Sequence, residues 1–228
     1  MSLPKIDLPR YQHHLFGASK PISYRAFTIK EQKILLLAKQ TQDENQQIEA
    51  IKQIIELCTF NTVNPDELAF FDVEDLFLRI RSKSVSEMCE LNYRDKVTNK
   101  RYQITVNLDD VRVTVPEGHS KKIELTDNIG IMMKYPTLNM VNNKDAMTED
   151  EVVKKCIDYI YDSENIYPAS EISKEDLNEW IEALDTSSAL KIRQFFDSMP
   201  SLRHEVVIKL DDDRSETIKF EGIESFFT

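Results

Sequence analysis

The spacing of apolar residues changes three times along this chain of 228 residues, and this restricts the folds it can adopt. Residues 29–82 and 145–198 place their apolar side chains at helical intervals, whereas residues 88–135 and 205–220 alternate with the period of a strand. Successive blocks of helices and strands predict an α+β fold rather than a series of βα units. We therefore expect helices combined with two antiparallel β-hairpin modules.

The first helical block predicts three helices, preceded by two short strands or a hairpin over residues 11–16 and 22–29. Thr28 suits the N-cap of a helix over residues 29–39, because Glu31 follows at the position that closes a capping box. The apolar run at residues 34–38 is the expected buried stretch of that helix. Further helices are expected over residues 43–58 and 68–82.

Two hairpins are expected in the strand-like blocks. The first joins residues 88–93 to residues 101–108 through a polar turn, and short strands at 111–115, 123–125 and 129–135 extend it into one antiparallel module. The second joins residues 205–210 to 216–220 through a charged turn. Each hairpin follows a helix, which is only a weak internal similarity.

The second helical block predicts helices over residues 145–161, 173–184 and 187–198. The first of them opens with Thr148 ahead of three acids that suit a helix N-terminus. We expect two domains. Residues 1–140 would form N-terminal strands, helices and the antiparallel β module, and residues 141–228 an acidic helical segment with the C-terminal hairpin.

Glycine scarcity limits the chemistry open to the chain. It has four glycines, Gly17, Gly118, Gly130 and Gly222, and they are widely separated. A dinucleotide-binding fingerprint, a phosphate-binding P-loop and a nucleophile elbow all need closely spaced glycines, because only a bare backbone approaches phosphate or turns so sharply. These three motifs are absent.

No other residue pattern predicts catalysis, a cofactor or a metal. The four histidines, His13, His14, His119 and His204, lack the spacing of a helical metal site, and we expect them at the surface or its rim. Three separated cysteines, Cys58, Cys89 and Cys156, form no CxxC pair and are expected to be reduced thiols. We therefore predict no catalytic residue, no cofactor and no metal ligand.

Charge is distributed unevenly. The net charge is −11, which opposes general nucleic-acid binding. Residues 1–40 carry a net +5, however, and residues 142–185 a net −9, and such polarity can steer association with a partner. The candidate partner-binding residues are the acids Glu149, Asp150 and Glu151 and the terminal aromatics Phe226 and Phe227, which either enter the core or dock on a partner.

No apolar run is long enough for a membrane span, and the N-terminus does not have the pattern of a signal peptide.

Three stretches, residues 24–38, 71–87 and 125–140, together with the opening LPKIDLPRY and the closing EGIESFF, carry a resemblance to a known family. They resemble the baseplate proteins of T-even-like contractile-tailed bacteriophages, whose members are baseplate hub subunits or hub assembly proteins. The resemblance implies a non-enzymatic role, as a chaperone-like assembly factor or a hub subunit that contacts other hub proteins. It implies a place in the host bacterial cytoplasm during assembly, or in the tail baseplate of the virion.

Two other functions remain open at this point. Tail hubs of this type can carry lytic enzymes, so a cell-wall hydrolase that uses scattered carboxylates is the alternative, although no acid pair is set in an apolar context. A regulatory nucleic-acid binder is opposed by the charge.

Overall fold

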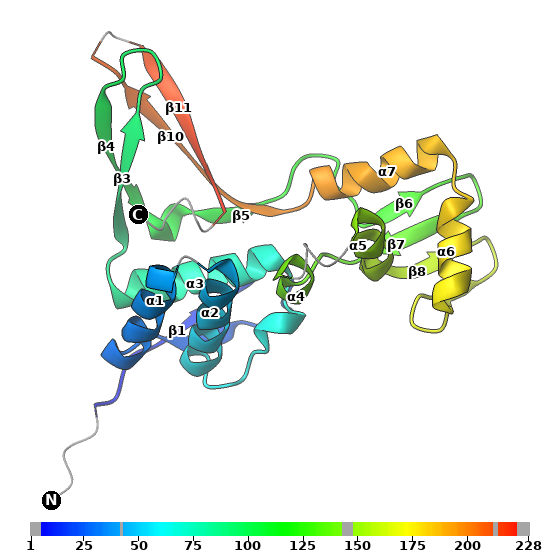
Figure 1. Ribbon diagram of the computed structural model, residues 1–228, viewed down its shortest axis with the longest axis horizontal. Coiled ribbons are helices and arrows are strands. Elements are labelled where there is room, and N and C mark those ends of the chain that lie inside the picture. The colour runs from blue at the N-terminus through cyan, green and yellow to red at the C-terminus, as the bar shows by residue number, and fades with distance from the viewer. Residues whose placement is uncertain (1–5, 42, 143–147, 212–213, 223–228) are drawn as a thin grey trace, which may run out of the picture. The chain divides into compact units, whose positions relative to one another are not determined.

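The computed structural model describes residues 6–41, 43–142, 148–211 and 214–222, and it has the expected α+β architecture of helices and small antiparallel sheets (Figure 1). The chain divides into two units. The hairpin unit comprises Met1–Thr114 with Ser201–Thr228, and the inserted unit comprises Val115–Pro200. The boundary expected after residue 140 lies within the inserted unit. That unit begins among strand-like residues, so no change of spacing marks its start.

The hairpin unit is built around one buried helix. Strand β1 (Arg10–His13) pairs antiparallel with β2 (Ile22–Arg25), and helices α1 (Ile29–Thr41), α2 (Glu44–Cys58) and α3 (Phe70–Ser84) follow near their predicted ranges. Every side chain of α3 from Phe71 to Ile80 is buried, including the charged ones. Because buried charges are costly unless they are paired, the neighbours of α3 must supply partners.

The apolar run at residues 34–38 is not the buried stretch of α1. Leu36 and Leu37 are exposed, and the buried residues of the helix are Glu31 and Ala38. Glu31 accepts hydrogen bonds from Arg25, at 2.7 Å, and from the Thr28 backbone N–H, at 2.6 Å. These bonds hold Glu31 inward and so turn the two leucines outward.

Both predicted hairpins are present and share one core. Strand β3 (Met88–Arg94) pairs with β4 (Arg101–Asn107), and β10 (Ser201–Lys209) pairs with β11 (Ser215–Glu221). The two hairpins lie side by side (Figure 1), and inward side chains from both join one apolar cluster with Leu78 of α3. At the tips, Arg214 pairs with Asp95 at 2.9 Å.

The inserted unit leaves and re-enters the hairpin unit at neighbouring positions. Strand β5 (Arg112–Thr114) pairs antiparallel with the start of β10, where Thr114 lies opposite Ser201. These two residues bound the insertion on either side. The hairpin unit is therefore a continuous structure interrupted at a single point.

The inserted unit holds a four-stranded antiparallel sheet with helices packed against it. The strand order is β6 (Lys122–Glu124), β7 (Gly130–Met133), β8 (Ile157–Tyr161) and β9 (Ile166–Pro168). The helices are α4 (Leu138–Asn142), α5 (Glu149–Cys156), α6 (Lys174–Glu182) and α7 (Thr186–Asp197). Residues of β7 and β8 form a core with Leu177 of α6 and Phe195 of α7. The strands predicted at 123–125 and 129–135 thus belong to this sheet and not to the module of residues 88–115.

The helix predicted over residues 145–161 is wrong at residues 157–161, and residues 145–147 lie outside the described residues. Helix α5 ends at Cys156, and Ile157–Tyr161 is the strand β8, paired with β7 on one side and β9 on the other. Ile157 and Ile160 are buried and three residues apart, which is a helical spacing, but the register between β8 and β7 shifts at Met132 and Met133. The β-branched and aromatic residues of IDYIY favour a strand, and two flanking strands satisfy its backbone.

Candidate functional site

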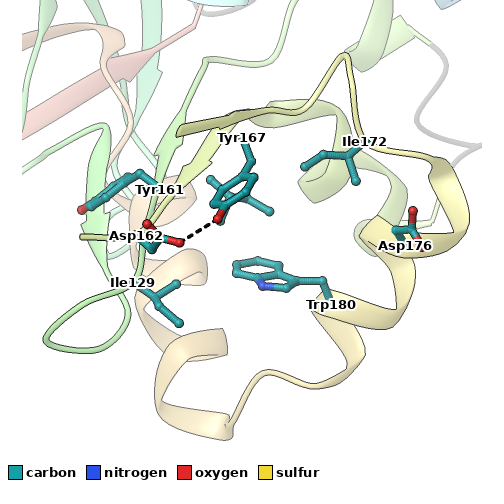
Figure 2. A pocket seen from close by; sticks show the side chains of 8 residues that line it. Ile129, Tyr161, Asp162, Tyr167, Ile172, Asp176 and Trp180 are labelled. Carbon is teal, nitrogen blue, oxygen red and sulfur yellow. Dashed lines mark hydrogen bonds between the residues drawn. The ribbon is translucent and has the colours of Figure 1, made fainter. Parts of the chain in front are cut away.

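A cavity of about 370 Å³ opens on the inserted unit beside β8, β9 and α6 (Figure 2). Its lining is mostly aliphatic and aromatic, with two carboxylates. The lining residues are Ile129, Ile160, Tyr161, Asp162, Tyr167, Ile172, Asp176 and Trp180. Apolar walls with a few placed polar groups are typical of a binding site.

The turn between β8 and β9 fixes the first carboxylate. Asp162 accepts hydrogen bonds from the backbone N–H groups of Glu164, at 2.8 Å, and Asn165, at 2.7 Å, and from the Tyr167 hydroxyl, at 2.7 Å. These bonds lower the pKa of Asp162. The cavity therefore has an ionised carboxylate held in one orientation at its rim, and Tyr167 is oriented by the same contact (Figure 2).

Helix α6 supplies the opposite wall. Ser173 caps this helix by accepting a hydrogen bond from the Asp176 N–H at 3.0 Å, as its sequence predicts. Asp176 and Trp180 are four residues apart and so lie on one side of the helix. The only tryptophan of the chain thus lies in the cavity wall, on a helix whose start is fixed by the Ser173 cap.

Gly130 has a packing role beneath the cavity. It lies opposite Tyr161 in the β7–β8 pairing, and the ring of Tyr161 occupies the space where a Cβ atom of residue 130 would lie. Lys122 lies over the same ring, 5.1 Å from its centre. The position of Tyr161, a cavity wall, therefore depends on a residue without a side chain.

The acids selected from the sequence lie outside the cavity. Glu149, Asp150 and Glu151 form the exposed first turn of α5, and none of them lines the cavity. Glu151 completes the capping box by accepting from the Thr148 N–H at 2.7 Å. Phe226 and Phe227 lie outside the described residues. The sequence does not indicate the cavity residues, because the spacing of residues 157–161 predicts a helix and leaves the neighbours of that segment undefined.

The hairpin unit contains a second polar cluster that the sequence did not reveal, around α3. The His13 ring and Asp75 are 2.6 Å apart, and Arg79 donates to Asp75 at 3.0 Å and to the Leu108 carbonyl at 2.7 Å. Burial works against ionisation of Asp75, but His13 and Arg79 hold its pKa below the ordinary value. Arg79 thus joins α3 to the segment that follows β4.

Asp72, one turn before Asp75, is a buried acid whose surroundings raise its pKa. Burial raises the pKa of Asp72 to about 6, although the Gly17 N–H donates to its carboxylate at 3.0 Å. A raised pKa can indicate a general acid. Here the side chain is covered by the β1–β2 connection and is 2% exposed, so a substrate has no access to it.

The histidines and cysteines do not form a metal or nucleophilic centre among the described residues. His119 stacks with both Tyr135 and Phe195, whose rings also stack with each other, and it bonds to Ser198; burial lowers its pKa. All three cysteines are buried, and within the described part of the chain no group of three potential ligands could hold a metal ion. No described helix has the length and apolar character needed to cross a bilayer.

Comparison with known proteins gives one family. The model of the family described as "T4 bacteriophage base plate protein" matches residues 8–228. No curated protein and no solved structure matches the chain. The match covers the cavity, the acidic segment and both hairpins together.

Proposed function

Because the chain belongs to the T4 bacteriophage base plate protein family, we propose that it works in the baseplate hub, without enzymatic activity, as an assembly factor or as a hub subunit. The family carries a structural or assembly role in the baseplate. The observation that supports the proposal is the family match across both units. Other hub proteins are the proposed partners, in the host cytoplasm during assembly and, for a subunit, in the finished tail.

We propose the cavity of the inserted unit as one docking site for such a partner. Tyr161, Tyr167 and Trp180 provide the aromatic surface on which binding energy is usually concentrated. Most of the lining residues come from the segment 142–185, which carries a net −9 in the sequence. A cavity of this kind fits a segment with one apolar anchor side chain flanked by lysine or arginine.

Purification of mature virions distinguishes the two forms of the proposal. A hub subunit should be present at a fixed copy number in washed particles. An assembly factor should be abundant in infected cells, bound to hub proteins, and absent from particles. Normal baseplates made after deletion of the gene would contradict both forms.

Docking at the cavity can be tested by capture of hub proteins from infected cells with the purified chain. Glu175→Lys with Glu179→Lys reverses two exposed charges of α6 beside Trp180, and should weaken capture of hub proteins. Asp110→Lys, at an exposed acid of the hairpin unit, is the control. Capture by the parent chain should also fall as salt is raised, and capture that does not respond to salt would argue against the acidic surface.

The acids chosen from the sequence can be tested in the same assay. Glu149→Gln with Asp150→Asn removes two charges from α5 and leaves the capping box of Thr148 and Glu151 intact. If these acids contact a partner, the variant captures less hub protein than the parent at low salt. Equal capture would remove them from the proposed surface.

The alternative, a cell-wall hydrolase, is tested with a zymogram. We expect no clearing of peptidoglycan by the purified chain. Clearing that is lost on replacement of a carboxylate would establish the alternative.

A further inference from the structure

Helix α1 presents large aliphatic side chains to solvent. Ile29 is 74% exposed, Leu36 53% and Leu37 63%. Ile29 and Leu36 are seven residues apart, which is about two helical turns, so they lie on the same side. Leu37 is turned about 100° from Leu36 around the helix axis, and the buried Glu31 and Ala38 lie opposite Ile29 and Leu36. The outer face of α1, defined by Ile29, Leu36 and Leu37, is therefore a broad apolar stripe, with Lys33 within it, that the described residues leave uncovered.

All the exposed charged side chains of α1 itself are positive. Lys30, Lys33 and Lys39 are exposed, and none of them has an ion pair among the described residues. The single acid of the helix, Glu31, is buried against Arg25 at 2.7 Å. On the adjacent helix α2, Glu49 is bound to Lys52 at 2.8 Å, which leaves Glu56 as the other exposed acid with a described side chain.

We propose that the outer face of α1 docks an acidic amphipathic helix of another baseplate protein. This inference goes beyond the docking site proposed for the inserted unit, because it uses a different surface and requires a partner of opposite charge. A helix offers its neighbour side-chain ridges and grooves but no free backbone edge, so a second helix covers it better than a strand does. From Ile29 to Leu37 the stripe is about 12 Å long, enough for two to three turns of the partner.

The occupant is a different protein rather than a second copy of this chain. The described helices with a net negative charge are α2, α5 and α6. The apolar side chains of α2 are buried at Ala50, Ile54 and Ile55, and those of α5 and α6 pack in the core of the inserted unit, including Val152, Val153, Leu177 and Trp180. None of these helices has an apolar face left for α1. A partner must therefore bring an acidic helix whose apolar face is still open.

The test uses the full chain and two labelled synthetic peptides of roughly 18 residues. Both carry leucines on one helical face, and the other face is rich in glutamate in the first peptide and lysine in the second. Fluorescence anisotropy should show binding of the glutamate peptide, weakening with salt, and at least about tenfold weaker binding of the lysine peptide. Equal binding of the two peptides would overturn the proposal.

Variants locate the peptide on the molecule. Leu36→Gln with Leu37→Gln should weaken binding of the glutamate peptide at least about tenfold, because both side chains are exposed and replaceable without loss of core packing. Lys30→Gln with Lys33→Gln should weaken it and reduce its salt dependence. Leu190→Gln, at a 60% exposed leucine of α7, is the control and should leave binding unchanged. Unchanged binding by the Leu36/Leu37 variant, with an unaltered circular dichroism spectrum, rejects the site.

Two further measurements address the other possible occupants. Light scattering over a concentration series should show that the parent chain does not self-associate through α1. Self-association that the Leu36/Leu37 variant abolishes would make a second copy the occupant, and would overturn the proposal. A chain ending at Gly222 should bind the glutamate peptide as the full chain does. Tighter binding by this shorter chain would identify residues 223–228 as the occupant instead, and would also overturn the proposal.

Discussion

Asp72 is a buried carboxylate whose ionised form destabilises the folded state. The carboxylate is held by the Gly17 N–H, and a Cβ at residue 17 would lie 2.6 Å from its oxygen, so a side chain at this position would displace the carboxylate. Because the folded-state pKa, about 6, is above the ordinary value, the fold binds a proton more tightly than the unfolded chain does. Its contribution to stability is therefore largest in acid and declines as the pH rises from about 4 to 6.

Asp72→Asn should remove that decline. We expect the variant to be more stable than the parent at pH 7.5 by about 1 to 3 kcal/mol, with the difference shrinking toward pH 4. Arg25 lowers the pKa of Glu31 to about 2, which gives the opposite pH dependence, so variant and parent are compared at each pH. Urea unfolding followed by circular dichroism measures the difference, with the exposed Asp110→Asn as control. Parallel pH profiles for variant and parent would contradict this account.

The cysteines give a second prediction for single residues. Burial raises the pKa of Cys58 to about 12 and that of Cys156 to about 11, and Cys89 is also buried. We expect none of the three thiols to react with Ellman's reagent in the folded chain at pH 8, and all three to react in guanidinium. Rapid reaction of one thiol in the native protein would show that its part of the core opens.

Helix α3 is the element on which the hairpin unit depends. Arg79 lies in its buried stretch and donates to Asp75 and to the carbonyls of Leu108 and Val111. One side chain thus satisfies a buried carboxylate and two backbone acceptors that follow β4. Without it, a buried charge and two carbonyls would lose their partner.

Arg79→Met should therefore destabilise the hairpin unit by about 3 to 5 kcal/mol. The single tryptophan, Trp180, is in the inserted unit, so its fluorescence reports the unfolding of that unit alone. We expect the variant to shift the urea transition seen by circular dichroism and to leave the Trp180 transition in place. Arg193→Met removes an exposed pair with Asp197 on α7 and should change stability by less than about 0.5 kcal/mol. A shift of the Trp180 transition in Arg79→Met would show that the two units unfold together.

The elements were predictable where local signals and tertiary contacts agree. The helices α2 and α3 and both hairpins follow from spacing, caps and turn residues. The spacing failed at residues 157–161, because Ile157 and Ile160 are three residues apart, which is the spacing of a helical face. The strand arises from pairing with β7, whose register shifts between Met132 and Met133, and with β9. It failed at Leu36 and Leu37 because the ion pair of Arg25 and Glu31 sets which side of α1 faces inward.

The cavity could not be predicted from the spacing of the residues either. Its acidic surroundings were visible in the sequence, but its walls come from β8, the β8–β9 turn and α6, which meet only in the folded sheet. Ser173 and Asp176 gave a local signal for the start of α6. Nothing local indicated that Trp180 would lie across from Tyr167 (Figure 2).

The whole molecule consists of the hairpin unit with the inserted unit placed at one point of its chain. The residues on either side of the inserted unit, Thr114 and Ser201, are partners in an antiparallel pair of strands. Their backbones are therefore close enough to be joined by a short turn. Because the chain leaves and re-enters the hairpin unit at paired residues, the strands of the hairpin unit do not need the inserted unit to bring them together.

Replacement of residues 115–200 by Asn-Gly should leave a folded hairpin unit, since this dipeptide suits a tight turn between paired strands. The fragment 115–200, which contains the four-stranded sheet and its helices, should fold by itself. Cooperative thermal unfolding by circular dichroism checks both products. Dispersed, noncooperative melting of either product would mean that the two units need each other to fold.

The pairing of Thr114 with Ser201 also has an evolutionary consequence. A recombination event at that one place can delete, duplicate or exchange the whole inserted unit without rethreading the rest of the polypeptide. The inserted unit would then change while the hairpin unit is inherited unaltered. We expect members of the family to differ most in length and composition between these two positions.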